Sequence, residues 1–196
     1  MTSTVLITGC SSGIGAATVR HFAAQGWNVA ATLRDPAAAH FEDSAGKVAS
    51  FALDVTDPQS VDAAVAQAVE RFGHIDVLIN NAGYGLFGPF ETATQEVIER
   101  QFQTNVFGVF AVTRAVLPHM RERAGGVIIN VASLTGLVAM PLYSLYAASK
   151  FAVVGFSESL SHELAPLGIR VKVFAPGAVA TDFSGRSLAR TFEGDG

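Results

Sequence analysis

Short apolar runs and amphipathic stretches alternate from one end of the chain to the other. The apolar runs, rich in β-branched residues, cover residues 4–8, 27–33, 48–53, 75–80, 126–131 and 169–174. The helical patterns between them cover about 13–25, 58–72, 94–123 and 146–167. Apolar strands that alternate with helices are typical of a parallel sheet covered on both faces. With right-handed crossovers, the pattern predicts an α/β fold with a doubly wound parallel sheet, the three-layer Rossmann fold.

Composition narrows the class of protein. The chain has 196 residues, of which 49% are hydrophobic and 15% are charged. This length and core content predict one domain over residues 1–196, and no repeat, low-complexity tract or linker divides it. The net charge is −4 and no cluster of Lys or Arg is present. The charge balance therefore argues against nucleic-acid and membrane-surface partners.

Cysteine usage and the N-terminus bear on the compartment. The single cysteine, Cys10, excludes an internal disulfide and favours a reducing environment. The N-terminus has no basic region followed by a long apolar run, and no apolar segment is long enough to span a bilayer. We therefore expect a cytoplasmic protein. The five histidines are scattered and no cysteine cluster accompanies them, so no metal site is expected.

Three glycines lie in the turn after the first predicted strand, in the segment Thr8-Gly-Cys-Ser-Ser-Gly-Ile-Gly15. Gly9 would allow a tight turn, Gly13 a close approach of backbone to a diphosphate, and Gly15 close packing of the helix on the strand. Unpaired N–H groups at the helix N-terminus would face the phosphates. A glycine-rich turn alone can be purely structural. After the first strand of an alternating α/β chain, however, it predicts nucleotide binding.

The end of the second predicted strand bears on the choice of cofactor. An NAD site usually places an acid here to bind the ribose 2′-hydroxyl, whereas this chain has Leu33 followed by Arg34. A guanidinium can hold a 2′-phosphate through paired hydrogen bonds. We therefore favour NADP(H), with Ser11 as a second phosphate contact. The alternative is that Arg34 is a solvated loop residue and Asp35 binds the ribose.

Polar residues also follow the third and fourth predicted strands. Asp54 could accept a hydrogen bond from an adenine amino group, or could serve as a turn or cap acid. Asp57, directly before a proline, is interpreted as a helix N-cap. Asn80 and Asn81 can tie neighbouring strand ends together, and Gly83 permits close approach of backbone to a ligand. A plain turn is the alternative for these last residues.

The candidate catalytic residues lie in the second half of the chain. Tyr146 and Lys150 are four apart, the spacing that places two side chains on one helix face. A lysine cation there would lower the pKa of the phenol and make it a general acid or base near neutral pH. Ser133 follows the fifth apolar run, where its hydroxyl could bind a substrate oxygen. The Tyr–Lys pair alone also fits an amphipathic helix with a snorkelling lysine.

Two further positions belong with this set. Asn105 is a poor residue for the middle of a helix, so its side chain or a loosened backbone carbonyl could hold a water that leads protons away from Lys150. The alternative is an Asn that faces solvent. After the last predicted strand, Pro176 to Thr181 would lie at the carboxyl edge of the sheet, where Thr181 could bond a nicotinamide carboxamide.

Together these motifs resemble the short-chain dehydrogenase/reductase family. The resemblance rests on Thr8-Gly-x-x-x-Gly-Ile-Gly15, Asn80-Asn-Ala-Gly83, Asn105, Ser133, Tyr146-x-x-x-Lys150 and Pro176-Gly177, which agree in order and spacing over nearly the whole chain. Residues 30–35, with the glycine turn, also look like the NADP-preferring hydroxysteroid and retinol dehydrogenase branch.

The resemblance implies roles for individual residues. Asn105, Ser133, Tyr146 and Lys150 would act as a catalytic tetrad. Lys150 would also hold the nicotinamide ribose, Asp54 would bind adenine, and Asn81 would lie by the adenosine ribose. The full set expected to contact the cofactor is Gly9, Ser11, Ser12, Gly13, Ile14, Gly15, Arg34, Asp54, Val55, Asn81, Ala82, Gly83, Tyr146, Lys150, Pro176, Gly177, Val179 and Thr181.

The chain departs from the family in length. Family members typically have about 250 residues, consistent with one doubly wound domain, whereas this chain ends at Gly196. The expectation is a chain that was cut short, lacking the rest of a substrate lid, a further helix and a last edge strand. Loss of that strand would expose the edge of the sheet to solvent or to a partner.

The predicted reaction is an oxidoreduction. Hydride would pass from the nicotinamide to a carbonyl carbon while Tyr146 protonates the oxygen and Ser133 steadies it. Tyr143 is followed four residues later by Ala147, so no cation shares its face. Loops determine specificity, and the expected apolar pocket wall indicates only an apolar alcohol or ketone. That wall comprises Leu134, Leu137, Val138, Met140, Leu142, Phe87 and Phe183.

Other functions stay open beside this one. The chain could be a catalytically inactive NAD(P)-binding protein that regulates a partner, although the complete tetrad argues against it. An epimerase or dehydratase would usually carry a larger C-terminal substrate domain. By resemblance, residues 94–123 and 146–167 would pack on a second subunit in a homodimer or homotetramer. The phenylalanines of these segments, which also fit an ordinary core, are Phe102, Phe107, Phe110, Phe151 and Phe156.

Overall fold

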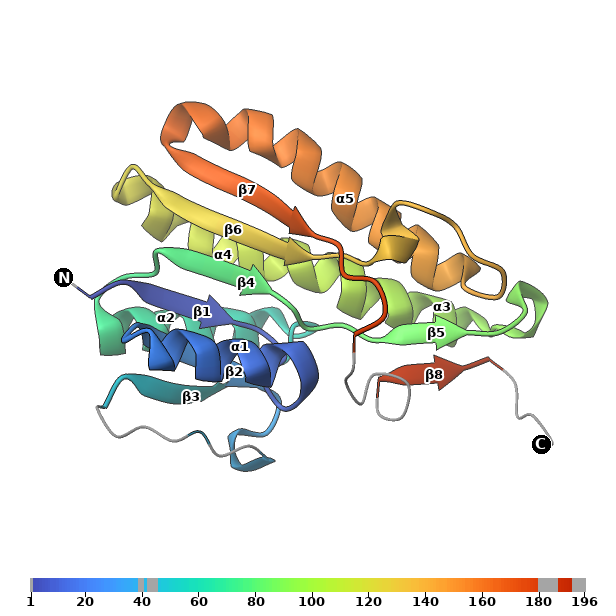
Figure 1. Cartoon of the computed structure of the whole chain (residues 1–196), viewed down its shortest axis with the longest axis horizontal. Coiled ribbons are helices and arrows are strands. Elements are labelled where there is room, and N and C mark those ends of the chain that lie inside the picture. Colours follow the sequence, from blue (N-terminus) through green and yellow to red (C-terminus); the bar gives the residue numbers. More distant parts are fainter. Residues whose placement is uncertain (1, 39–40, 42–45, 180–186, 192–196) are drawn as a thin grey trace.

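Six parallel strands form one sheet in the order β3-β2-β1-β4-β6-β7 (Figure 1). The computed structural model describes residues 2–38, 41, 46–179 and 187–191. The strands are β1 (Thr4–Ile7), β2 (Asn28–Leu33), β3 (Val48–Ala52), β4 (Val77–Asn80), β6 (Gly126–Val131) and β7 (Ile169–Phe174). β1 and β4 are neighbours at the centre of the sheet, and the strands that follow each of them in sequence lie progressively farther out on its own side. Ligands of such sheets bind at the carboxyl ends near this change of direction, and the predicted doubly wound fold is confirmed.

Helices cover both faces of the sheet because alternate strand residues point to opposite sides. Val5 and Ile7 pack on one face with Val19 of α1 (Gly13–Ala24). Leu6 and Leu78 pack on the other face, with helices α2 (Pro58–Phe72), α4 (Gly108–Glu122) and α5 (Ser144–Leu164). The continuous apolar runs of the sequence are thus explained by burial on both sides.

The long helix predicted over residues 94–123 is divided into three parts. They are α3 (Gln95–Phe102), a π-helical segment η3 (Gln103–Phe107) and α4. In η3 the Gly108 amide donates to the Gln103 carbonyl, five residues earlier, so the helix accommodates one extra residue per turn. Asn105 lies within this wider turn. The helix predicted over 146–167 also differs from the expectation. It is α5 (Ser144–Leu164), which begins two residues earlier and is followed by a 3-10 turn, η5 (Ala165–Leu167).

Two short strands form a second, separate parallel pair that the sequence pattern did not predict. β5 (Gly85–Phe87) pairs with β8 (Leu188–Arg190), with Gly85 opposite Leu188. Three-residue strands are too short to show a periodicity of their own. The remaining short helical turns are η1 (Pro36–Ala38), η2 (Phe90–Thr92) and η4 (Leu134–Gly136). Within the described residues, no helix combines the length and apolar character that a bilayer crossing needs.

Candidate active site

The glycine-rich turn between β1 and α1 packs closely against the residues that follow β4, at the carboxyl edge of the sheet. Gly9 has a φ of +72°, a conformation that side chains other than glycine rarely adopt. A Cβ on Gly15 would overlap the Gly9 carbonyl oxygen and lie 2.6 Å from the Asn81 amide nitrogen. Ser12 begins α1 without a side-chain capping bond. The first N–H groups of α1 therefore lack that internal partner, as an anion-binding helix terminus requires.

Thr8 and Asn81 lock this turn to the end of β4. The Thr8 hydroxyl accepts from the backbone amides of Asn81 and Ala82, each at 3.0 Å. The Asn81 side chain donates to the Thr8 carbonyl at 2.9 Å and to the Gly9 carbonyl at 3.1 Å. The predicted tie between neighbouring strand ends is therefore present. Asn81 ties β4 to the turn after β1, and Asn80 ties β4 to its other neighbour, β6, by donating to the Asn130 side chain at 2.9 Å.

Four charged residues follow β2 and β3 at the same edge. Arg34 is exposed, and its charge acts on Asp54. Partial burial alone would raise the pKa of the Asp54 carboxyl, but hydrogen bonds from Thr56 and the Arg34 charge hold it below its usual value. Asp35 accepts from the Ala37 amide at 3.0 Å and so caps η1. Asp57 accepts from the Gln59 amide at 2.9 Å, which confirms it as the N-cap of α2.

Tyr146 and Lys150 lie side by side on the buried face of α5. Each is only 6% exposed, and the Lys150 Nζ lies 5.8 Å from the centre of the Tyr146 ring. The Lys150 ammonium donates to the Val131 carbonyl, at the end of β6, at 2.8 Å. The predicted shared helix face is confirmed, and α5 brings this face to the carboxyl edge of the sheet.

The acid–base properties of the pair differ from the expectation. Burial raises the pKa of the Tyr146 phenol above its usual value; a hydrogen bond with Ser133 lowers it in part, and Tyr143 adds to the rise. Burial also lowers the pKa of the Lys150 ammonium, to about 8. The pKa of the phenol is therefore shifted in the direction opposite to the expected lowering, because the loss of solvation outweighs the hydrogen bond with Ser133.

Ser133 lies directly between β6 and η4. Its hydroxyl oxygen accepts from the Thr135 amide at 3.3 Å and from the Thr135 hydroxyl at 3.0 Å, so Ser133 caps η4. The Leu134 amide donates to the Pro176 carbonyl at 2.9 Å. The segment after β7 thereby lies against the segment after β6, as predicted for the carboxyl edge.

Asn105 is fully buried rather than facing solvent. Its side chain pairs with the backbone of Tyr84 in both directions, accepting from the Tyr84 amide at 3.1 Å and donating to its carbonyl at 2.9 Å. It also donates to the Ser149 hydroxyl at 3.2 Å, next to Lys150. A Cβ on Gly83 would lie 3.0 Å from the Asn105 side-chain oxygen and 3.6 Å from the Lys150 nitrogen. The structure thus brings the four predicted catalytic residues to one region.

Other predicted residues occupy the same edge with different exposure. Ser11, Gly177 and Val179 are exposed, Ile14 and Ala82 are half-buried, and Val55 is buried against α4 beside Gly108. Thr181 and Phe183 lie outside the described residues.

The expected apolar wall is exposed in the loop between β6 and α5, over Leu134, Leu137, Val138, Met140 and Leu142. Phe87 packs instead on Tyr143, with ring centres 5.1 Å apart.

Sequence reasoning missed the polar residues that support this region. Gln101 is fully buried on α3 and donates to the Tyr84 carbonyl at 3.0 Å, beside the Asn105 bond. Its position, four residues before Asn105, was a usable signal because a polar side chain there shares the helix face. The Ser133-x-Thr135 spacing, typical of a capping hydroxyl, was another.

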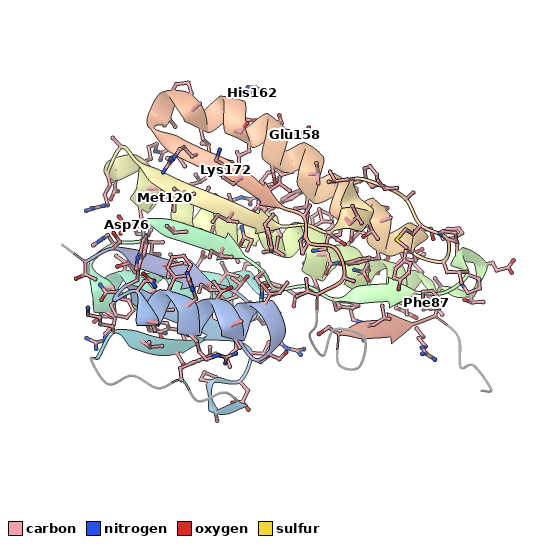
Figure 2. All side chains as sticks on the ribbon, in the orientation of Figure 1. Asp76, Phe87, Met120, Glu158, His162 and Lys172 are labelled. Atoms are coloured by element: carbon pink, nitrogen blue, oxygen red, sulfur yellow. The ribbon has the colours of Figure 1, made fainter. Side chains whose placement is uncertain are left out.

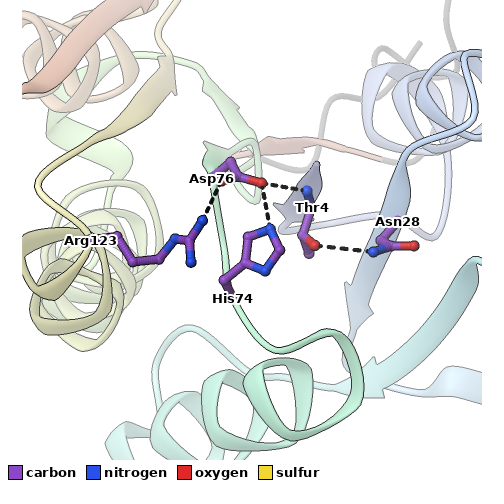
Figure 3. Close-up of polar contacts among 5 residues, drawn as sticks. All are labelled: Thr4, Asn28, His74, Asp76 and Arg123. Carbon is purple, nitrogen blue, oxygen red and sulfur yellow. Dashed lines mark hydrogen bonds and ion pairs between the residues drawn. The ribbon is translucent and has the colours of Figure 1, made fainter. Parts of the chain in front are cut away.

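A second polar cluster lies at the opposite, amino end of the sheet (Figure 3). Asp76, just before β4, accepts from the Thr4 amide at 2.7 Å and from the His74 ring at 3.0 Å. Arg123 lies 3.9 Å from the other carboxylate oxygen, and Asn28 donates to the Thr4 hydroxyl at 3.3 Å. No three His, Cys, Asp or Glu side chains gather in a metal-binding group within the part of the chain that the structure describes.

Comparison with known proteins identifies the family. The family model described as short chain dehydrogenase matches residues 3–190. A 3-ketodihydrosphingosine reductase from Bacteroides thetaiotaomicron is 44% identical over 180 residues, 92% of this chain and 65% of its own length. Retinol dehydrogenase 8 from Bos taurus is 41% identical over 192 residues, 94% of this chain and 62% of its own length. The chain thus spans less than two thirds of the length of these relatives.

A solved structure agrees with the sequence matches. The 3-ketoacyl-(acyl-carrier-protein) reductase from Brucella melitensis, complexed with NADH, superimposes with a TM-score of 0.87 at 37% identity, over 92% of this chain and 77% of that one. The fold of this chain therefore matches that of the reductase over most of its length. The chain belongs to the short-chain dehydrogenase family.

Proposed function

We propose that the chain carries out NADP(H)-dependent hydride transfer between a nicotinamide and an apolar carbonyl or secondary alcohol. The observation that carries the proposal is the meeting of Ser133, Tyr146 and Lys150 beside Gly83, at the carboxyl edge of the sheet. We further propose that residues 1–196 form one NAD(P)-binding domain with this site built into it. The buried lone Cys10 supports a reducing, cytoplasmic location.

The residues present fit a dinucleotide. Ser12 makes no side-chain capping bond at the N-terminus of α1, where backbone N–H groups favour a diphosphate, and Gly13 at that terminus has a φ of 54°. Bound NADPH would supply the hydride that no side chain of the protein can provide. Lys150, Gly83 and the segment at Pro176–Gly177 would hold its nicotinamide half, and Asp54 its adenine.

Tyr146 would act as the proton donor in the reduction direction. Because burial raises the pKa of its phenol, the group carries its proton at neutral pH and can give it to a developing alkoxide. The Ser133 hydroxyl and the Lys150 cation, which stays protonated below pH 8, stabilise the negative charge left on the phenol oxygen.

Replacement of the phenol tests the proposal. Tyr146→Phe should lower kcat by about 10²–10⁴-fold while NADPH still binds, because only the transferable proton is lost. Tyr143→Phe is the matched control and should keep its activity, since no cation shares its helix face. Near-normal turnover by Tyr146→Phe would refute the assignment, and NADPH binding without any turnover in the unmodified protein would favour the regulatory alternative.

Arg34 supports the preference for NADP(H). It is exposed at the end of β2, while the Asp35 carboxylate is engaged with the Ala37 amide. Arg34→Asp should shift preference from NADPH towards NADH, measured as the ratio of kcat/KM for the two cofactors. Arg20→Asp, an equal charge change on the exposed side of α1, is the control. An unchanged ratio in Arg34→Asp would remove the phosphate-binding role.

The substrate class is argued from the exposed loop between β6 and α5. Its apolar side chains, such as Leu137 at 53% and Val138 at 59% exposure, offer surface for an apolar substrate. Two relatives are named for 3-ketodihydrosphingosine and for retinol, in keeping with the retinol dehydrogenase-like branch. Screening of ketones and secondary alcohols by NADPH absorbance tests this, and a preference for charged sugars would contradict it.

We also propose assembly through η3, α4 and α5 into a homodimer or homotetramer. Phe107 is 52% exposed and Phe151 44% exposed, which is costly unless a second copy covers them. Phe110 and Phe156 stack between the two helices, with ring centres 4.3 Å apart. Phe151→Glu should dissociate the assembly in sedimentation measurements, and a monomeric unmodified protein would contradict the proposal.

A further inference from the structure

A fully buried glutamine, Gln101 of α3, holds the backbone of the residue that follows Gly83. Gln101 is 0% exposed, and its side-chain amide donates to the Tyr84 carbonyl at 3.0 Å. Asn105 donates to the same carbonyl at 2.9 Å and accepts from the Tyr84 amide at 3.1 Å. Three hydrogen bonds therefore hold the Tyr84 backbone, and both lone pairs of its carbonyl oxygen are filled.

The two side chains restrain this backbone in different ways. The Asn105 bonds fix the distance between Asn105 and Tyr84, but the backbone could still tilt about the line that joins them. The bond from Gln101 comes from a second side chain and restricts this tilt. Asn105 lies in the wider turn of η3, whereas Gln101 lies in the regular helix α3. Because α3 packs against the apolar cluster that contains Tyr146, Gln101 ties the Tyr84 backbone to the surroundings of the phenol.

Stability alone does not explain a glutamine at this position. The Gln101 side-chain oxygen is buried and has no hydrogen-bond partner among the residues that the structure describes. A buried acceptor without a partner costs free energy, and an apolar side chain of similar size avoids that cost. The bond to the Tyr84 carbonyl is therefore what a glutamine provides here and a leucine does not.

The backbone that Gln101 holds lies beside Lys150. A Cβ on Gly83 would lie 3.6 Å from the Lys150 nitrogen and 3.0 Å from the Asn105 side-chain oxygen. Gly83 and Lys150 belong to the residues that we propose hold the nicotinamide half of the cofactor. Because Tyr84 directly follows Gly83, a shift of the Tyr84 backbone would move Gly83 relative to Lys150.

We propose that Gln101 is a positioning residue for the nicotinamide half of the cofactor, acting through the backbone of Tyr84 and Gly83. In this role it touches neither the cofactor nor the substrate. The inference rests on the proposed function, because that proposal places the nicotinamide beside Gly83 and Lys150. Loss of the Gln101 bond should weaken binding of the nicotinamide half and leave binding of the adenosine half unaffected.

Binding measurements on the full chain test this role without any turnover. Gln101→Leu should raise the Kd for NADPH about fivefold, as the loss of one neutral hydrogen bond predicts. The Kd for adenosine 2′,5′-bisphosphate, which carries only the adenosine half with its 2′-phosphate, should stay the same. The urea midpoint should not fall, because the Tyr84 carbonyl keeps its bond from Asn105. Gln67→Leu, the same change at an exposed position of α2, is the matched control and should alter neither Kd.

A carboxyl at the same position gives a second test, because its ability to donate depends on pH. A protonated carboxyl can donate one hydrogen bond to the Tyr84 carbonyl, whereas a carboxylate can only accept. Burial raises the pKa of a carboxyl, so the Kd of Gln101→Glu for NADPH should match that of the parent at about pH 6 and exceed it roughly fivefold at about pH 9. Other titratable groups of this region, including Tyr84, Tyr146 and Lys150, are present in the parent as well, so the ratio of the two Kd values removes their effect.

Three results would overturn the inference. They are an unchanged Kd for NADPH in Gln101→Leu, an equal rise of Kd for NADPH and for the bisphosphate, and a Gln101→Glu ratio that does not vary with pH. If Gln101→Leu does not fold, Gln101→Met carries the first test with the same expected values.

The positioning role and the proposed function fail separately. NADPH binding that weakens in Gln101→Leu, in a protein that turns over no carbonyl or alcohol, would contradict the proposed function and support the positioning role. Turnover that depends on Tyr146, together with NADPH binding that does not depend on Gln101, would contradict the positioning role and support the function.

Discussion

Each end of the sheet holds a charged side chain, but the groups that surround it differ between the two ends. At the amino end, the Asp76 carboxylate meets an imidazole, a guanidinium and a backbone amide. At the carboxyl end, Lys150 is buried against a carbonyl, and no carboxylate pairs with it among the residues that the structure describes. Figure 2 labels Asp76 at one end and Phe87, on β5, at the other.

The difference separates a cluster that fits a stabilising role from one that fits the proposed chemistry. Asp76 is 31% exposed and accepts from the Thr4 amide and the His74 ring, so its carboxylate keeps part of its solvation while it joins β1 to the start of β4. Lys150 is unmatched, and burial lowers its pKa to about 8. A site that keeps an uncompensated cation beside a phenol loses stability but gains a charge that can act on a ligand.

The largest expected effect is on turnover at the carboxyl end. Lys150→Met should lower kcat/KM by about 10²-fold or more, because the variant lacks the cation that we propose supports the phenolate. Asp76→Asn should keep kcat/KM within about twofold. Steady-state NADPH oxidation with a substrate of the unmodified protein measures both. Equal losses of kcat/KM in the two variants would contradict the assignment of different roles to the two ends of the sheet.

Stability against pH should also single out Lys150. In the unfolded chain its pKa is about 10.4, so between pH 8 and 10 the unfolded state binds more protons than the folded state. Burial of the charged Lys150 side chain therefore lowers the free energy of unfolding by roughly 3 kcal/mol below pH 8. As the pH rises from 8 to 10, this loss of stability is progressively recovered. Urea unfolding should find Lys150→Met more stable than the parent at pH 7, with the gap narrowing by pH 10. A gap that is constant with pH would contradict the lowered pKa.

At the amino end, the effect should appear in stability alone. Asp76→Asn weakens the bonds from the Thr4 amide and the buried His74 ring, which should cost about 1–2 kcal/mol of unfolding free energy. Urea midpoints measure the cost, with the denaturant slope unchanged. A wild-type midpoint would show that the cluster does not stabilise the junction of β1 and β4.

The smallest effect is expected for the outer member of that cluster. Arg123 is 45% exposed and lies 3.9 Å from Asp76. Arg123→Gln should therefore change the unfolding free energy by less than about 0.5 kcal/mol. A loss as large as that of Asp76→Asn would mean that the guanidinium, rather than the His74 ring, is the main partner of the carboxylate.

The sequence predicted the elements whose signals are local. The apolar runs located all six strands of the main sheet, with ends shifted by at most two residues. The four-residue spacing of Tyr146 and Lys150 placed them on one helix face. Gly9 and Gly15 marked the turn because a backbone or packing constraint there acts on the residue itself.

Other features depended on contacts between distant segments. The π turn around Asn105 accompanies bonds to Tyr84 and Ser149 that no helical periodicity shows. The raised pKa of Tyr146 depends on how deeply α5 is buried, which spacing alone does not measure. Gln101 and Thr135 gain their importance only from the groups to which they donate.

The pairing of β5 with β8 has a consequence for the order in which the chain closes. It joins segments far apart in sequence, such as Thr92 and Thr191, which are 99 positions apart and whose hydroxyls lie at 2.6 Å. With three residues per strand, this ladder gains little until the main sheet exists, so we expect it to close late in folding. Its amides, including those of Gly85 and Thr191, should exchange with deuterium through local opening before the amides of β1 and β4. Because Ala189 packs in the same apolar cluster as Tyr146, this opening loosens the packing beside the phenol while the six-stranded sheet stays intact.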